Sequence, residues 1–247
     1  MRTLVTGLHR SGNSVMAHLL SEATGKTLLD DPRWVIEHPV SGLAYRVNPK
    51  YYQELCEFDI VKAPRMVESL NNLLVNFPDI SIIYMVRDPR DVYASILEKI
   101  QAKLPTSMLD NKRFGDCKSD WEGVARSFNY YTNSIMYIER NFQNKIYFVD
   151  YENFFLNKQI YIEFLSKQLR FSILNSKLEL ILDKQYNTDG KSPFDQAIKG
   201  PNRWRRDINQ AIAQEIYDLT EVATTRLKEH CNQLKYEIKQ SFTTLLD

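Results

Sequence analysis

Short apolar runs alternate with longer amphipathic segments along this chain. Residues 81–86, Ser-Ile-Ile-Tyr-Met-Val, are apolar after the first position and rich in β-branched side chains, which is typical of a strand buried on both faces of a parallel sheet. Three further strands are expected at residues 2–7, 58–64 and 145–154, the last running into a turn. Helical spacing is present at residues 11–23, 69–77, from Pro89 onward, at 121–142, and from 209 to the end.

The alternation of strands with helices predicts an α/β fold in three layers, α/β/α, with a central parallel sheet. No internal repeat, low-complexity tract or shift in composition marks a domain boundary, so residues 1–247 are expected to form a single domain. Residues 104–118 and 187–202 contain proline, glycine and many polar side chains and are expected to be loops. In such a fold, phosphate-bearing ligands bind at the carboxyl ends of the strands.

Composition and charge narrow the class of protein. The chain is 43% hydrophobic, and its 32 Lys and Arg residues balance 31 Asp and Glu residues, which argues against nucleic acid as the main partner. No apolar run is long enough to predict a membrane span. Cys56, Cys117 and Cys231 are isolated, which favours free thiols in a reducing compartment. Because Met1 leads directly into a strand, no signal peptide is expected, and we expect a cytoplasmic protein.

The first predicted strand ends in Gly-Leu-His-Arg-Ser-Gly-Asn-Ser, residues 7–14, which has the outline of a phosphate-binding loop. Gly7, Gly12 and Ser14 occupy the fixed positions of the pattern G-x-x-x-x-G-x-[ST]. Asn13 stands where loops that bind ATP or GTP have a lysine, which argues against ordinary phosphoryl transfer. The positive charge lies inside the loop, at Arg10. Since the N–H groups at a helix N-terminus still bind an anion, the pattern indicates a phosphate-containing donor other than ATP.

Three segments, in this order, resemble the nucleotide-binding motifs of sulfotransferases, which use 3′-phosphoadenosine 5′-phosphosulfate (PAPS). They are GLHRSGNS at 7–14, RDPRDVYAS at 87–95 and KGPNRWRRDI at 199–208, with Lys-Ala-Pro at 62–64 and Asp-Tyr-Glu at 150–152 between them. Arg-Ser-Gly in the first loop is similar to the bacterial and Golgi-type branch of the family. The resemblance implies the P-loop NTPase-like sulfotransferase fold and transfer of a sulfuryl group to an acceptor hydroxyl, with release of 3′-phosphoadenosine 5′-phosphate (PAP).

By this resemblance, the first two motifs hold the two phosphate-bearing ends of the donor. Backbone N–H groups of residues 10–15 would bind the 5′-phosphate, and Arg10 would neutralise charge on the bridging oxygen as the S–O bond breaks. Arg87 and Ser95 would bind the 3′-phosphate, which suits the donor geometry of a guanidinium. The alternative is a magnesium–nucleotide site with Asp88 as its acid. The loop residues expected to contact the nucleotide are His9, Arg10, Ser11, Gly12, Asn13 and Ser14.

The third motif resembles the family's late loop, which closes over the nucleotide. Its residues expected to bind the nucleotide are Lys199, Gly200, Arg203, Trp204 and Arg205. The basic residues would meet the 3′-phosphate, and Trp204 would pack on the nucleotide or beneath the loop; a solvated basic turn with a buried tryptophan is the alternative. Tyr151 matches a position that contacts the adenine in the family, with a buried core aromatic as the alternative.

The resemblance also implies catalytic roles for a lysine at the end of a strand and for an acidic residue shortly after the first helix. Lys62 would help to stabilise the transferring sulfuryl group, although a strand-end lysine reaching solvent is the alternative. Pro64 stands where the cytosolic animal branch has its histidine base, so the base has to come from elsewhere. Asp31, before Pro32, is the expected general base, unless it is only a turn residue. Glu37 and His38 are the next candidates; His9, His18 and His230 show no partner pattern.

The sequence therefore predicts a PAPS-dependent sulfotransferase that needs no metal, with Arg10, Lys62 and Asp31 as catalytic residues. Aromatic side chains at 31–55 and 100–140 are compatible with a carbohydrate, a phenol or a small alcohol as the acceptor. Two other classes remain open: a P-loop kinase-like phosphotransferase and a non-catalytic protein that binds PAP on the same fold. Nothing in the sequence specifies an oligomeric state.

Overall fold

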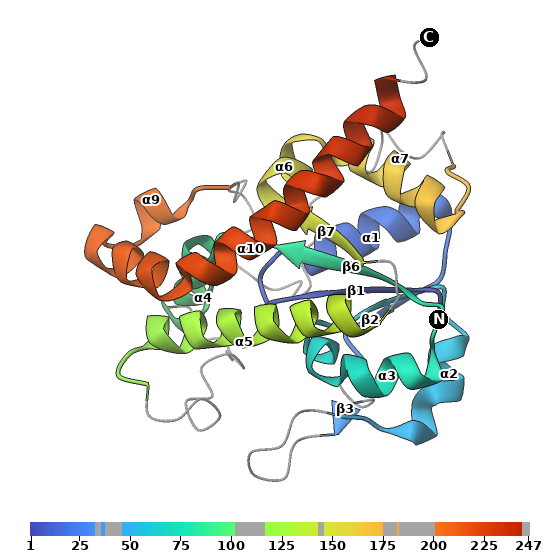
Figure 1. Ribbon diagram of the computed structural model, residues 1–247, viewed down its shortest axis with the longest axis horizontal. Helices are drawn as coiled ribbons and strands as arrows, with labels where there is room; N and C mark the ends of the chain where they lie inside the picture. The colour runs from blue at the N-terminus through green and yellow to red at the C-terminus, as the bar shows by residue number, and fades with distance from the viewer. Residues whose placement is uncertain are drawn as a thin grey trace.

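The computed structural model describes residues 1–32, 36–37, 46–101, 117–142, 146–174, 182 and 201–243 (Figure 1). Its strands are β1 (Thr3–Gly7), β2 (Leu28–Asp30), β3 (Ile36–Glu37), β4 (Arg46–Val47), β5 (Ile60–Lys62), β6 (Ser81–Val86) and β7 (Ile146–Asp150). Its helices are α1 (Asn13–Thr24), α2 (Tyr52–Cys56), α3 (Leu70–Asn76), α4 (Pro89–Gln101), α5 (Asp120–Asn141), α6 (Tyr151–Leu156), α7 (Lys158–Leu169), α9 (Trp204–Asp207) and α10 (Gln210–Thr243). Two 3-10 helices are also present, η2 (Pro49–Tyr51) and η3 (Pro64–Ser69).

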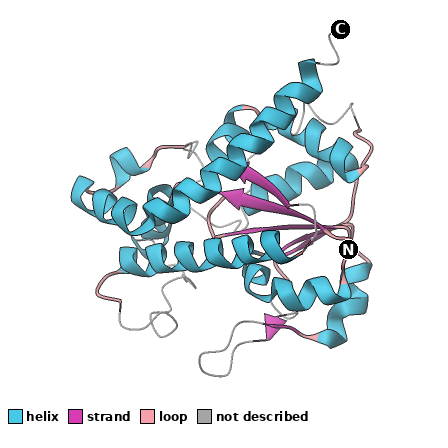
Figure 2. Ribbon diagram, viewed as in Figure 1, coloured by secondary structure: helices cyan, strands magenta, loops and turns pink. Residues whose placement is uncertain are grey.

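Five strands form one parallel sheet in the order β2-β5-β1-β6-β7 (Figure 2). The central strand β1 pairs with β5 on one side, with Val5 opposite Lys62, and with β6 on the other, with Val5 opposite Ile83. The short strands β3 and β4 pair antiparallel in a separate ladder. The predicted three-layer α/β/α architecture around a central parallel sheet is confirmed.

Helices cover both faces of the sheet, because strands that are apolar on every position have to be buried on both sides. On one face, Leu4, Ile82 and Tyr84 pack with η3, α3, α4 and α5. On the other face, Val5 and Ile83 pack with α1, α6 and α7. Figure 1 shows α3 and α5 on one side of the strands and α1, α6 and α7 on the other.

The long helix α10 covers the edge of the sheet at β7. Ile216 and Leu227, in its N-terminal half, belong to the core that includes α5, whereas Leu234 and Ile238 belong to the core that includes α1. The helix therefore crosses from one face of the sheet to the other in front of β7 (Figure 1). Since an uncovered edge strand is a site of aggregation, this placement protects the sheet. None of the described helices combines the length and the apolar character that crossing a bilayer requires.

Several elements differ from the sequence prediction. The strand β2 was not predicted, because three residues are too few to show a periodic pattern. The strand expected at 58–64 is shorter, since Pro64 begins η3. The strand expected at 145–154 ends at Asp150, whose carboxylate accepts the N–H of Asn153 at 2.7 Å and caps α6. Helices α2 and α7 were not predicted either, and the expected loops at 104–118 and 187–202 lie almost entirely outside the described residues.

The direction of the chain connections reverses between β1 and β6. After β1 the chain passes through α1 to β2 on one side, whereas after β6 it leads to β7 on the other side. The switch point between the carboxyl ends of β1 and β6, called the crevice below, is where open α/β sheets bind their ligands. The loop that contains Arg10 follows β1, and Arg87 follows β6, so the fold brings the first two motifs together there.

Candidate active site at the carboxyl edge of the sheet

The loop after β1 has the backbone of a phosphate-binding turn. Arg10 and Gly12 have left-handed φ angles of 68° and 89°, and α1 begins at the next residue, Asn13. The N–H of Ser11 donates to the carbonyl of Leu8 at 3.2 Å, which closes the turn. A Cβ on Gly7 would lie 2.5 Å from the carbonyl oxygen of Met85, so this position requires glycine. The loop thus presents the N-terminus of α1 toward the crevice, as a loop that binds an anion does.

Asn13 braces this loop from the inside. Its Nδ2 donates to the carbonyl of Leu8 at 2.9 Å, and its side chain is buried. The residue in the lysine position therefore holds the turn together and offers no cation to a nucleotide. Ser11 is buried as well, whereas His9, Arg10 and Ser14 remain partly exposed beside the crevice.

Arg87 supports the loop from the end of β6. Its Nη1 donates to the carbonyl of Arg10 at 2.8 Å, and its guanidinium lies 4.4 Å from the ring centre of Tyr151. A Cβ on Gly12 would lie only 2.4 Å from that ring, so the loop, Arg87 and Tyr151 form one packed unit. Arg87 is 6% exposed, and its Nε and Nη2 are buried without a hydrogen-bond partner in the part of the chain that the structure describes. Such unpaired donors on a buried cation cost free energy until an acceptor satisfies them.

Arg10 and Ser95 are in direct contact. The Nε of Arg10 donates to the hydroxyl oxygen of Ser95 at 3.0 Å. Ser95 lies on α4 and is buried. The resemblance gave Arg10 to the 5′ end of the donor and Ser95 to the 3′-phosphate, and the structure joins the two side chains. The first and second motifs therefore form one continuous set of donors along the ends of β1 and β6.

A second cluster lies at the ends of β2 and β5. The Nζ of Lys62 is 2.7 Å from Oδ1 of Asp30, its partner residue in the strand register, and His18 on α1 reaches Oδ2 of Asp30 at 2.9 Å. Burial opposes the charge on Asp30, but the hydrogen bonds from His18 and Lys62 outweigh it and lower the pKa of this carboxyl to about 2. The sequence gave His18 no partner, and the structure corrects that expectation.

Asp31, the predicted base, follows directly in a left-handed conformation with φ 49°. Its N–H donates to the carbonyl of Lys62 at 2.7 Å, so its backbone is held at the end of β5. Of the two other candidates, Glu37 lies in β3 and His38 lies outside the described residues.

The segment before α10 docks on α4. Arg203 donates to Glu98 at 3.1 Å and to Asp207 at 2.7 Å, so its guanidinium is engaged within the protein. The ring of Trp204 lies 4.0 Å from the guanidinium carbon of Arg90 and 4.9 Å from that of Arg205. Trp204 is therefore packed beneath basic side chains, and Arg205 is exposed. Lys199 and Gly200, also predicted to bind the nucleotide, lie outside the described residues.

Two carboxylates near this crevice were missed by sequence reasoning. Asp91 is fully buried on α4 and accepts backbone N–H groups from Asn202 and Trp204. The sequence signal for Asp91 was its position in the Arg-Asp-Pro-Arg-Asp motif, but its partners come from a distant segment. The second is Glu152, whose pKa is raised to about 7 by burial and by the nearby charge of Asp150.

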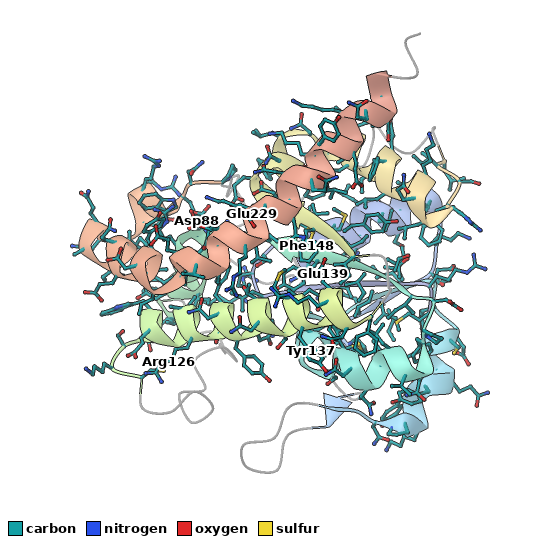
Figure 3. All side chains as sticks on the ribbon, viewed as in Figure 1. Asp88, Arg126, Tyr137, Glu139, Phe148 and Glu229 are labelled. Carbon is teal, nitrogen blue, oxygen red and sulfur yellow. The ribbon has the colours of Figure 1, made fainter. Side chains whose placement is uncertain are left out.

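Asp88, the acid of the alternative magnesium–nucleotide reading, pairs with an arginine. Figure 3 labels Asp88 where α4, α9 and α10 meet, and its carboxylate lies 2.6 Å from Nη2 of Arg90.

This geometry is that of a P-loop-type fold: a glycine loop at a helix N-terminus, at the switch point of a parallel sheet, with a buried arginine beneath it. A sequence model described as the sulfotransferase family matches residues 29–172, more than half of the chain, and the chain therefore belongs to the sulfotransferase family. The match includes Lys62, Arg87, Ser95 and Tyr151, but it begins after the first loop and ends before α9. A search of curated protein sequences finds no match.

Solved structures show the same fold. A sulfotransferase from Alicyclobacillus acidocaldarius is 12% identical, with a TM-score of 0.56 over 94% of this chain and 95% of that one. The mouse sulfotransferase SULT7A1 in complex with PAP is 14% identical, with a TM-score of 0.57 over 92% of this chain and 88% of that one. The sulfotransferase fold predicted from the sequence is thereby confirmed.

Proposed function

We propose that this sulfotransferase uses PAPS as its donor and transfers the sulfuryl group to a hydroxyl of a carbohydrate, a small alcohol or a phenol, releasing PAP. Membership of the family and the PAP complex of a protein with the same fold support this proposal. The observation that carries it is Arg87, a buried guanidinium under the loop with two nitrogen donors that have no hydrogen-bond partner among the described residues. A donor with a 3′-phosphate supplies the anionic acceptors that such a group requires.

The residues around Arg87 fit PAPS better than ATP with magnesium. Asn13 is occupied inside the loop, so the cation that a triphosphate requires is missing from its usual place. Arg10, which is partly exposed in the loop, would instead stabilise charge on the bridging oxygen as the S–O bond breaks. The loop N–H groups not used within the turn, with Ser14, would bind the 5′-phosphate.

In the proposed reaction, the acceptor oxygen attacks sulfur in line with the departing phosphate oxygen. A new O–S bond forms, the S–O bond to the phosphate breaks, and the acceptor proton passes to a base. Lys62 would meet the sulfuryl oxygens and Asp31 would take the proton. We keep Asp31 as the base in preference to Asp30, because a carboxylate whose pKa is held at about 2 by two partners is a weak proton acceptor.

The same proposal includes the domain organisation, the cellular compartment and the class of acceptor. A single domain over residues 1–247 would carry the whole site. The three cysteines are unpaired thiols, which supports a reducing compartment such as the cytoplasm. The acceptor would be a small molecule or a carbohydrate.

Calorimetric titration with PAP, and separately with ATP and magnesium, tests the proposal. We expect PAP to bind without a metal and ATP to bind far more weakly. ATP binding that depends on magnesium would overturn the proposal in favour of a kinase-like enzyme. PAP binding with no turnover of PAPS across hydroxyl acceptors of the three classes would instead indicate a non-catalytic binding protein.

A further inference from the structure

Residues 201–207, called the docked segment below, are tied to α4 by three separate contacts. The carboxylate of Asp91 accepts the N–H of Asn202 at 2.7 Å with Oδ2 and the N–H of Trp204 at 2.9 Å with Oδ1. Arg90 lies over the ring of Trp204, and Glu98 pairs with Arg203. The α4 residues that make these contacts are Arg90, Asp91 and Glu98, and the same helix carries Ser95.

Asp91 is the centre of this arrangement. It is 0% exposed, and burial of a carboxylate raises its pKa; the N–H of Trp204, the charge of Arg87 and the N–H of Asn202 act in the opposite direction. It also lies in the first turn of α4, where the helix dipole favours a negative charge. Burying a carboxylate costs free energy unless its oxygens accept hydrogen bonds. Both oxygens of Asp91 accept N–H groups of the docked segment, which accounts for a carboxylate at this buried position.

The backbone that Asp91 holds includes a left-handed residue. Asn202 has a φ of 63°, a conformation that asparagine adopts more readily than most residues other than glycine. The bond from its N–H to Asp91 helps to hold this conformation, and Trp204 begins α9 only two residues later. Without the carboxylate, the turn would lose the contact that fixes where α9 starts.

We infer that Asp91 is a positioning residue of the nucleotide site, which holds the docked segment in register with Arg87 and Ser95 by accepting its backbone N–H groups. The inference rests on the proposed function for the identity of the nucleotide. Asp91 itself would not touch the donor; it connects the second motif to the third by accepting main-chain N–H groups.

The test uses Asp91→Asn in the full chain, because the amide keeps the shape but replaces one acceptor oxygen with an NH2 group. We expect PAP to bind roughly 10-fold to 100-fold more weakly, and the KM for PAPS to rise by a similar factor, while kcat changes less than about 3-fold. Hydrogen exchange of the amides of residues 202–207 should become at least about 10-fold faster without any ligand. A role confined to global stability would move exchange throughout the protein and would not separate KM from kcat.

Asp59→Asn is the matched control. Asp59 also holds a neighbouring segment, through the N–H and hydroxyl of Thr27 at 3.4 and 3.3 Å, but it lies at the amino end of β5, whereas the candidate site lies at the carboxyl ends of the strands. This variant should leave PAP affinity and exchange in the docked segment unchanged. If Asp91→Asn does not fold, Glu98→Gln weakens the tie to Arg203 and should shift both readouts in the same direction by a smaller amount.

The readouts separate the two proposals. Faster exchange with unchanged PAP affinity and KM would overturn the positioning role and leave the proposed function standing. Unchanged exchange in the docked segment would show that Asp91 does not hold it, which overturns the inference directly. A wild-type protein that does not bind PAP would overturn the proposed function and the nucleotide role, whereas the exchange comparison would still report on the docking itself.

Discussion

The two halves of the carboxyl edge hold positive charge in opposite ways. At the ends of β1 and β6, Arg87 contacts a carbonyl and an aromatic ring, and two of its nitrogen donors lack a hydrogen-bond partner within the described ranges. At the ends of β2 and β5, Lys62 is 5% exposed on its side chain and already pairs with Asp30, which it shares with His18. In the β1/β6 half, Arg87 thus has donors left for a ligand. In the β2/β5 half, the charge of Lys62 is balanced by Asp30.

This difference suggests a division of labour in the proposed reaction. The 3′-phosphate would stay charged throughout the catalytic cycle. A buried cation such as Arg87, with donors not used among the described residues, suits the binding of such a group. The sulfuryl group is present only until it is transferred. A cation such as Lys62 can contact it during transfer and pair with Asp30 again afterwards. We therefore expect the β1/β6 half to determine donor affinity and the β2/β5 half to determine turnover.

The largest effect should come from Lys62→Met, which removes the charge but keeps much of the apolar stem. Turnover of PAPS should fall by about 1000-fold, in the range seen when one group that stabilises transition-state charge is removed. PAP affinity should stay within about 3-fold, because PAP lacks the sulfuryl group. Steady-state kinetics and PAP titration check both values, and a large loss of PAP affinity would contradict the division.

A pair of variants in the same half follows. Asp31→Asn should lower kcat by about 100-fold if Asp31 is the base, which is a usual size for general base catalysis. Asp30→Asn should lower kcat less and also loosen Lys62 and His18, because it removes the charge that they share. The kcat values of the two variants decide the assignment: the reverse order would make Asp30 the base and Asp31 a turn residue.

The next effect belongs to the other half. Arg87→Ala should weaken PAP binding by about 50-fold, since the net loss of its charge-assisted hydrogen bonds should total roughly 2 kcal/mol. Arg87→Lys keeps the charge but loses the fork of donors, and we expect it to recover only part of the affinity. Both variants are titrated with PAP beside Arg126→Ala, which removes an exposed arginine from an ion pair on α5. Unchanged affinity in Arg87→Ala would remove this residue from the phosphate site.

The smallest effect should be on stability, at Glu152. Its pKa is raised from 4.5 to about 7, so the native protein binds more protons than the unfolded chain between these values, and stability falls as pH rises through this window. The shift corresponds to at most roughly 3 kcal/mol, and partial exposure reduces it. Glu152→Gln should therefore raise Tm by a few degrees at pH 8, with little change at pH 4. Thermal melts of both proteins across this range test the sign.

The sequence predicted most of the strands that position the site. The β6 run is unambiguous because its residues are apolar at five consecutive positions, and the glycine spacing located the loop after β1. The position of Lys62 beside the first strand was also predicted correctly. These features depend on local periodicity or on a motif of a few residues, and a single sequence carries that information.

The contacts between motifs could not be predicted in the same way. Asp91 accepts N–H groups from a segment far along the chain, and backbone donors leave no trace in side-chain identity. Lys62 meets Asp30 only because β2, which shows no periodic pattern, lies in register beside β5. Asn13 was recognised as a missing lysine, but its bond to the carbonyl of Leu8 became visible only in three dimensions.

The order of the strands has a consequence for how the protein is made. β1 is complete at Gly7 and forms the centre of the sheet, yet its partners β5 and β6 lie at residues 60–62 and 81–86. On the ribosome, this apolar strand emerges long before either neighbour, with its backbone groups unpaired. Pairing across such sequence separations is slow, and exposed strands aggregate while they wait. We therefore expect the yield of folded protein to depend on how well the nascent chain is shielded until β6 has left the ribosome.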